Sequence, residues 1–278
     1  MAVLFFITLF QTNTNHYMKQ QLLQKIKSAR TPDFGNLLSK SFDLFKKVWI
    51  DSFMHVIVTF LVAIPLMFLV YVPFIPAIIE AARDGGIDQM EPDFDFPILT
   101  MVAYGLMVFV LIVVVQMITI AITAHFYKVC RIKDLDTQED TGSYFSYLKE
   151  VNFGKVFALS LAHFGIAIAA ILLCYLPIFY VMVPLQLMVV IFAFNKELSV
   201  SDIISISFKL GNKFWLLVFG LIIVSSLLAQ LGIILCFVGL FFTAYFAYIP
   251  IYYFYKETIG FGGDTEELPE DFSIQYNN

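Results

Sequence analysis

The sequence VFALSLAHFGIAIAAILLCYLPIFYVMVPLQLMVVIFAFN, residues 156–195, runs for about 40 positions without an acidic residue, a lysine or an arginine. A helix needs roughly 20 apolar residues to cross a bilayer, so this stretch is long enough for two helices. Pro177 lies near its middle, where a proline favours the end of one helix and the start of another. The stretch therefore predicts a hairpin of two membrane-spanning helices.

Three further apolar stretches give the same kind of signal. The last one, Phe214 to Tyr255, is about as long and has Gly239 near its middle, so it predicts a second hairpin. Val48 to Ile79 and Pro97 to Tyr127 each predict one long span. The total is six spans. Hydrophobic residues make up 60% of the chain and charged residues 14%, whereas soluble domains have about 45–50% and about 25%, so a soluble domain is excluded.

The basic residues predict how these spans are oriented. Every lysine and arginine except Arg83 falls on one side of the membrane if both chain ends lie on that side. Arg83 stands in the acidic loop between the first two spans, at positions 80–95. Because positive charge is retained in the cytoplasm, we expect both termini there.

An internal repeat agrees with this count. SFDLFKKVW at 41–49 and SFKLGNKFW at 207–215 share Ser, Phe, Leu, Lys and Trp at identical spacing, and GKVF at 154–157 is a weaker third copy. Three units at about 31–128, 144–196 and 199–257 are predicted, each with a short amphipathic cytoplasmic helix, a basic-aromatic anchor and a helical hairpin. The predicted fold class is all-α: a polytopic membrane helix bundle with six transmembrane helices and a threefold hairpin repeat.

We expect one membrane domain at residues 18–260. Residues 1–17 are interpreted as an extension before the true start, because Met18 opens a polar, lysine-bearing segment, or alternatively as a disordered or short membrane-touching segment. Residues 261–278 are predicted to form a flexible acidic cytoplasmic tail. Thr31-Pro32-Asp33 and the segment from Ser199 to Asp202 carry the signals of helix starts.

Lysine next to tryptophan is typical of the membrane interface, where the ammonium meets lipid phosphate and the indole spans the boundary. The predicted anchors are Lys47, Trp49, Lys155, Lys213 and Trp215. They serve either as simple anchors or as a lipid-sensing surface.

Chemistry-bearing residues are sparse within the spans. The middle of each span lacks Asp, Glu, Lys and Arg, which argues against ion pumps and carboxylate-based antiporters. The few polar residues there are expected to bridge helices more often than to bind a substrate. Four tyrosines on one face of the last span either tie the bundle together or line a polar passage: Tyr245, Tyr248, Tyr252 and Tyr255.

Three histidines lie at similar depth near the cytoplasmic ends of the first three spans: His55, His125 and His163. Imidazoles at one level could hold iron or haem, or each could hydrogen-bond a neighbouring helix. The segment AHFG, Ala162 to Gly165, resembles histidine-bearing membrane carotenoid-cleaving oxygenases, whose other histidine motifs are missing here. The alternative function is therefore a histidine-metal membrane oxygenase acting on a lipophilic substrate such as a carotenoid.

With the repeated SFxLxxKxW motif, a long hairpin and the closing YIPIYYFYKETIG at 248–260, the chain resembles bacterial six-span membrane proteins related to the membrane domain fused to some glycerophosphodiester phosphodiesterases. The resemblance covers roughly residues 31–260 and implies no hydrolase activity, because the catalytic barrel of those fusions has no counterpart in this sequence. The resemblance implies a protein of the bacterial cytoplasmic (inner) membrane. We therefore expect a non-enzymatic multi-pass membrane protein that organises the membrane, passes a small solute or anchors a complex.

No catalytic residue and no cofactor is predicted. The expected partner is membrane lipid, and a protein partner would bind through the cytoplasmic face or the acidic tail. Nucleic acid is not expected as a partner, and the oligomeric state is left open.

Overall fold

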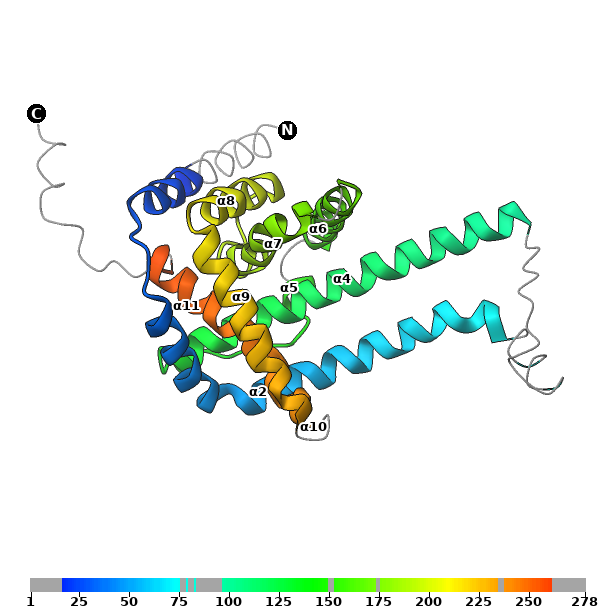
Figure 1. The fold of residues 1–278 in the computed structure, drawn as a ribbon, viewed down its shortest axis with the longest axis horizontal. Helices are drawn as coiled ribbons and strands as arrows, with labels where there is room; N and C mark the ends of the chain where they lie inside the picture. Colours follow the sequence, from blue (N-terminus) through cyan, green and yellow to red (C-terminus); the bar gives the residue numbers. More distant parts are fainter. Residues whose placement is uncertain are drawn as a thin grey trace, which may run out of the picture.

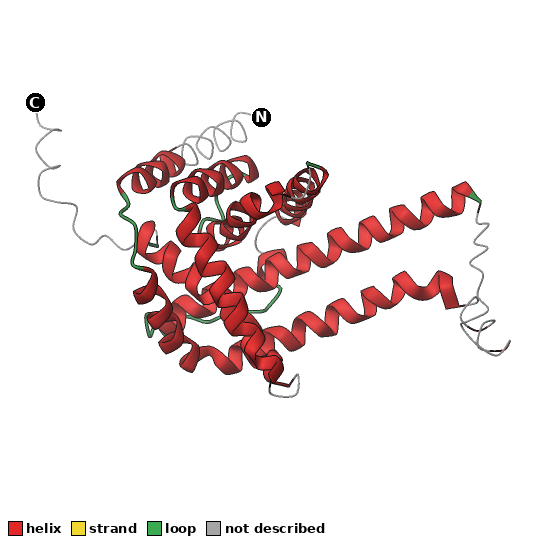
Figure 2. Cartoon of the chain, viewed as in Figure 1, coloured by secondary structure: helices red, strands yellow, loops and turns green. Residues whose placement is uncertain are grey.

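The computed structural model describes residues 17–75, 79, 83, 97–149, 153–173, 176–234 and 238–261. The predicted start extension, the acidic loop and the acidic tail lie almost entirely outside the described residues. The described part of the chain consists of helices and their connections, without strands (Figure 2). The all-α fold class is confirmed.

The elements follow one another as hairpins. A helix described from residue 17 to 28 comes first. The first hairpin contains α2 (Phe34–Tyr71), η1 (Val72–Phe74) and α4 (Ile98–Asp134). The second contains α5 (Ser146–Lys149), α6 (Phe153–Leu172) and α7 (Leu176–Phe194). The third contains α8 (Val200–Lys213), α9 (Trp215–Gln230), η3 (Leu231–Ile234), α10 (Val238–Thr243), η4 (Ala244–Tyr248) and α11 (Ile249–Thr258).

Six helical segments are long and apolar enough to cross a membrane. The first two are Phe34–Phe74 and Ile98–Asp134, and the other four lie in pairs within the second and third hairpins. The prediction of six spans is confirmed, and the chain is a multi-pass membrane protein.

The two predicted helix starts are also confirmed. The Asp33 carboxylate caps α2 by accepting the N–H of Asn36 at 2.8 Å. Ser199 caps α8, and its hydroxyl oxygen accepts the N–H of Asp202 at 3.2 Å. Both side chains satisfy a backbone donor that the first turn of a helix leaves without a partner.

The first and third repeat units differ in how the amphipathic helix joins its span. In the third unit α8 ends at Lys213 and α9 begins at Trp215, with Phe214 between them in a non-helical conformation. In the first unit the equivalent residues belong to one continuous helix, α2. The sequence offers a reason, because Gly211-Asn212 precede the break in the third unit, and both residue types favour a helix less than Phe45-Lys46 do.

The first hairpin projects from the rest of the molecule. Figure 1 shows α2 and α4 side by side, extending well beyond the other spans, which gather around one end of the pair. With its 37 residues, α4 is roughly 55 Å long, whereas the hydrocarbon core of a bilayer is about 30 Å thick. Such a helix must tilt or extend past the hydrocarbon.

We call the end of the hairpin around which the other spans gather the charged end. It holds the connections at 29–33, 135–145, 195–199 and 259–261 together with the adjoining helix termini. Ion pairs join these segments across long sequence distances: Lys19–Asp202 at 2.6 Å, Lys40–Glu257 at 2.7 Å, Lys47–Asp136 at 3.2 Å and Lys256–Asp134 at 2.6 Å. The charged end is thus a packed unit on which the spans converge.

Candidate functional site

Two of the three predicted histidines meet inside the bundle. His55 on α2 and His125 on α4 are 1% and 2% exposed. Nε2 of His55 lies 2.8 Å from Nδ1 of His125. The outer ring nitrogens face backbone carbonyls: His55 Nδ1 is 2.6 Å from the oxygen of Asp51, and His125 Nε2 is 3.2 Å from the oxygen of Thr141. Each ring is therefore held on both sides.

Aromatic side chains enclose this histidine pair. The Tyr144 ring lies 4.8 Å from the ring of His55 and 5.0 Å from that of His125, and Tyr245 and Phe126 pack on His55 at 5.4 and 5.1 Å. Burial raises the pKa of the Tyr144 phenol, and the Asp51 carboxylate adds to the rise. The phenol therefore keeps its proton beside the two imidazoles.

The contacts of the histidine pair limit where its protons can lie. A carbonyl oxygen can only accept, so the contacts of His55 Nδ1 and His125 Nε2 are hydrogen bonds only where those nitrogens carry a proton. The inner contact at 2.8 Å likewise needs one proton between its two nitrogens. Two neutral imidazoles supply only two N–H groups. Burial of both rings favours the neutral form, so the pair satisfies two of the three contacts at a time.

His163 does not join this pair. It lies on α6, and its buried Nδ1 has no hydrogen-bond partner among the described residues. Within the described part of the chain, no group of three or more His, Cys, Asp and Glu side chains is placed to hold a metal ion. His55 and His125 could offer a metal their inner nitrogens, with the outer N–H groups fixed by carbonyls as in many metal sites. They supply two ligands, fewer than the three that the sequence-based alternative needs.

The three predicted anchor lysines have a shared structural role. Each one donates hydrogen bonds to backbone carbonyls at or just past the end of a helix. Lys47 donates to the oxygen of Lys133 at 3.3 Å, and Lys155 to the oxygen of Lys196 at 2.6 Å. Lys213 donates to three carbonyls of the first helix, those of Ile26, Lys27 and Ala29, at 2.7, 2.8 and 2.8 Å.

Cations at helix C-termini satisfy unpaired carbonyls and interact favourably with the helix dipole. The sequence alone did not indicate this role for the repeated lysines. The two predicted anchor tryptophans differ from each other: Trp49 is 44% exposed, whereas Trp215 donates its indole N–H to the oxygen of Tyr180 at 3.2 Å and stacks on Phe219.

The tyrosines of the last span make hydrogen bonds that join elements of the bundle. The hydroxyl of Tyr252 and that of its neighbour Tyr253 donate to the Asp134 carboxylate at 2.8 and 2.7 Å, beside the ammonium of Lys256. The Tyr255 hydroxyl accepts the amide N–H of Asn195 at 2.7 Å. These contacts tie α11 to α4 and to the end of α7.

Sequence reasoning missed Asp134. A signal for it was present, because Asp134 and Lys256 both stand at span ends that the predicted topology places on one side of the membrane.

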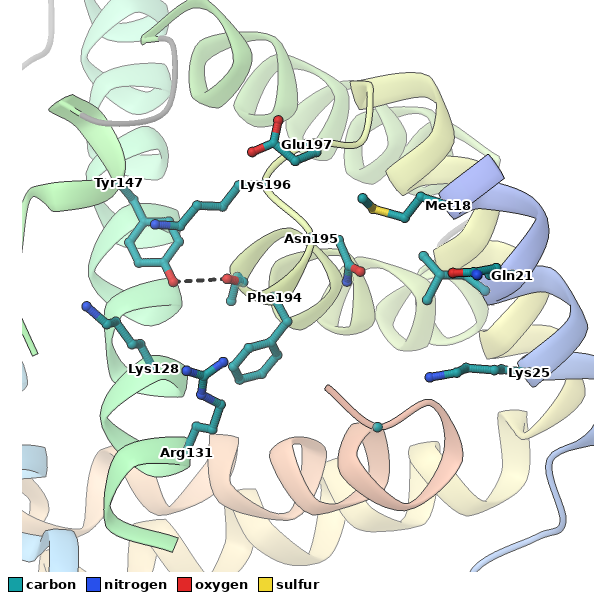
Figure 3. A pocket seen from close by; sticks show the side chains of 13 residues that line it. Met18, Gln21, Lys25, Lys128, Arg131, Tyr147, Phe194, Asn195, Lys196 and Glu197 are labelled. Atoms are coloured by element: carbon teal, nitrogen blue, oxygen red, sulfur yellow. Dashed lines mark hydrogen bonds between the residues drawn. The ribbon is translucent and has the colours of Figure 1, made fainter. Parts of the chain in front are cut away.

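A cavity of about 450 Å³ opens at the charged end and was also missed. Figure 3 shows Lys25 reaching toward it from the first helix, with Arg131 and Lys196 on the other side. Its thirteen described lining residues come from five parts of the chain: Met18, Gln21, Leu22 and Lys25; Lys128 and Arg131; Tyr147; Ala193, Phe194, Asn195, Lys196 and Glu197; and Gly260. No local motif could have indicated a site assembled in this way.

Comparison of the chain with protein-family models, with curated proteins and with solved structures found no match in any of the three.

Proposed function

We propose that this chain is a non-enzymatic multi-pass membrane protein that organises lipid around its first hairpin and holds that hairpin in place through the charged end. The proposal places the charged end and both termini in the cytoplasm of a bacterial cell, in line with the distribution of lysine and arginine. Kinship with the membrane domains fused to glycerophosphodiester phosphodiesterases is part of the same proposal.

The observation that supports this proposal most directly is that the apolar side chains of the first hairpin are exposed. Only 11% of the most apolar window of the first span, and 6% of that of the second, is buried inside the protein, against 61% for α7. Large side chains of this hairpin lie open, among them Leu61, Phe68, Leu99 and Leu106. Apolar surface on this scale needs lipid or another protein to cover it.

The outer halves of these helices hold each other, which keeps the bare surface in one piece. The hydroxyl of Tyr104 on α4 donates to the oxygen of Val70 on α2 at 3.0 Å. The ring of Tyr104 also packs edge-on against Phe74 at 5.5 Å. The paired helices therefore present one continuous apolar surface to the surrounding lipid.

The hydroxyl contacts within the spans favour lipid organisation over solute passage. Thr119 donates to the oxygen of Val115 at 2.8 Å, and Ser160 donates to that of Val156 at 2.8 Å. Ser225 donates to the oxygen of Leu221 at 2.6 Å. Hydroxyls that bond back to their own helix have less capacity to replace the hydration shell of a passing solute.

Reconstitution into vesicles that contain spin-labelled phospholipid tests this proposal. Matched deletions of 62–72 and 98–108 shorten both helices by about three turns each and keep their faces in register. We expect the full chain to immobilise clearly more spin-labelled phospholipid molecules per protein than the shortened chain. Equal numbers of immobilised lipids would contradict the proposal.

Two further measurements address the other candidate functions. Glycerol, urea and potassium flux should equal that of protein-free vesicles, and faster flux would favour solute passage. Stoichiometric iron or copper that disappears when His55, His125 and His163 are replaced together would favour the oxygenase.

A further inference from the structure

The cavity at the charged end is strongly basic. Four of the described residues that line it are cationic, namely Lys25, Lys128, Arg131 and Lys196, and Glu197 is the one acidic residue among them. Glu139, outside the lining, partly neutralises Arg131 by accepting from its guanidinium at 2.7 and 2.9 Å. Among the described residues, the cations of the lining still outnumber the acidic groups Glu139 and Glu197. An anion would therefore be attracted to the cavity.

The cations are held in place while some N–H groups stay available. Lys25 donates to the oxygen of Ile259 at 2.8 Å, and an ammonium has three donors. Lys128 uses two donors, on the oxygens of Asp140 and Thr141 at 2.8 and 3.1 Å. The positions of both ammonium groups are thus set before any ligand arrives, which lowers the entropy lost on binding.

The opposite wall is ordered in the same way. The Lys196 ammonium lies 4.3 Å from the centre of the Tyr147 ring, and the Tyr147 hydroxyl donates to the oxygen of Ala193 at 3.0 Å. Met18, Leu22 and Phe194 contribute apolar surface to the lining. The cavity volume of about 450 Å³ falls within the range of pockets that hold small organic ligands, about 300–1,000 Å³.

We propose that this cavity binds an organic phosphate, with the phosphate group between Lys25 and the cations of α4 and Lys196, and the organic part against Met18, Leu22 and Phe194. Lysine and arginine are the side chains that recognise phosphate by charge-assisted hydrogen bonds. The phosphate belongs either to the headgroup of an anionic lipid or to a soluble phosphate ester. This site goes beyond the proposed lipid-organising role, which depends on the bare hairpin.

The binding experiment separates the two sources. The full chain is titrated at low ionic strength in a neutral detergent with adenosine monophosphate and inorganic phosphate, and with sulfate as a control. In parallel, the chain is incorporated into nanodiscs of phosphatidylcholine with increasing phosphatidic acid. Thermal unfolding and titration calorimetry report binding. Binding of adenosine monophosphate identifies a soluble ester, and a shift with phosphatidic acid alone identifies a lipid headgroup.

Three substitutions locate the binding. Lys25→Gln should weaken it about fivefold or more, because one charge is removed at contact distance. Lys46→Gln removes the same charge from an exposed pair with Asp43 outside the cavity and should change binding less than twofold. Glu197→Gln removes the one acidic group of the lining and should strengthen binding several-fold. A gain of this kind cannot arise from misfolding.

The proposal is overturned if adenosine monophosphate binds no more tightly than sulfate and phosphatidic acid also causes no shift, since the cavity would then be at most a general anion patch. It is equally overturned if Lys25→Gln and Lys46→Gln weaken binding to the same extent, or if Glu197→Gln leaves binding unchanged.

Discussion

His55 Nε2 lies 2.8 Å from His125 Nδ1, and this contact joins the first two spans beside the charged end. Both imidazoles are buried, and both outer nitrogens face carbonyls. The pair thus forms a short chain of polar contacts that begins at the oxygen of Asp51 and ends at that of Thr141. The contribution of each histidine to stability therefore depends on the presence of the other.

A double-mutant cycle measures that dependence. His55→Leu or His125→Leu alone leaves the other imidazole with a buried nitrogen that lacks its partner, which should cost about 1–3 kcal/mol. The double replacement removes both polar groups and should cost less than the sum, with a coupling energy of about 1–3 kcal/mol. Reversible unfolding in mixed detergent measures each free energy.

His163→Leu is the matched control for this cycle. Its Nδ1 makes no hydrogen bond among the described residues, so its coupling to His55→Leu should be near zero. Strict additivity of His55→Leu and His125→Leu would contradict the paired arrangement.

Nitrogen NMR of the histidine rings checks the proton count. Because burial favours the neutral form, two of the four nitrogens of the pair should carry protons near pH 7. Lowering the pH should add a third proton and complete all three contacts. The contact left without a proton at neutral pH should be that of His125 with Thr141, which at 3.2 Å is the longest. Three protonated nitrogens at pH 7 would contradict a neutral pair.

Asp134→Asn tests the carboxylate that binds α11. The side chain of Asp134 is 13% exposed, and it accepts from Tyr252, Tyr253 and Lys256. Losing its charge should lower the free energy of unfolding by about 1.5–3 kcal/mol. Asp43→Asn makes the same chemical change in an exposed pair and should cost no more than about 0.5 kcal/mol. Equal losses in the two variants would rule out a special role for Asp134.

Lys213→Met tests whether the repeated lysine holds the first helix. Its ammonium donates to three carbonyls at residues 26, 27 and 29. Without it, the amides of residues 22–28 should exchange with solvent about tenfold faster, which corresponds to about 1.4 kcal/mol. Lys209→Met on the same helix removes an exposed lysine and serves as control. Unchanged exchange in Lys213→Met would exclude this role.

Much of the fold was predictable because local chemistry determines it. Four apolar stretches, two of them long enough for a hairpin, predict the six spans, and Asp33 and Ser199 at the predicted starts cap α2 and α8. The continuity of α2 was not predicted. It depends on the difference between Phe45-Lys46 and Gly211-Asn212, which a comparison of the repeats could have shown.

The contacts of the candidate sites were much harder to predict. Nothing local distinguishes a lysine that meets lipid phosphate from one that binds a carbonyl, and the carbonyl partners of Lys213 lie 184–187 residues away. Lys25 and the oxygen of Ile259 are 234 residues apart. The pairing of His55 with His125 likewise depends on the relative rotation of α2 and α4, which periodicity does not determine.

The lysine contacts of the first helix also bear on the order in which a ribosome-bound chain can acquire its structure. Residues 17–28 are synthesised before every span, yet Lys213, which holds their last carbonyls, is made nearly two hundred residues later. Until then the carbonyls of Ile26 and Lys27 lack this partner. Docking of residues 17–28 through Lys213 is therefore a late step of biogenesis, and we expect a nascent chain stalled before Lys213 to leave this helix accessible to proteases and chaperones.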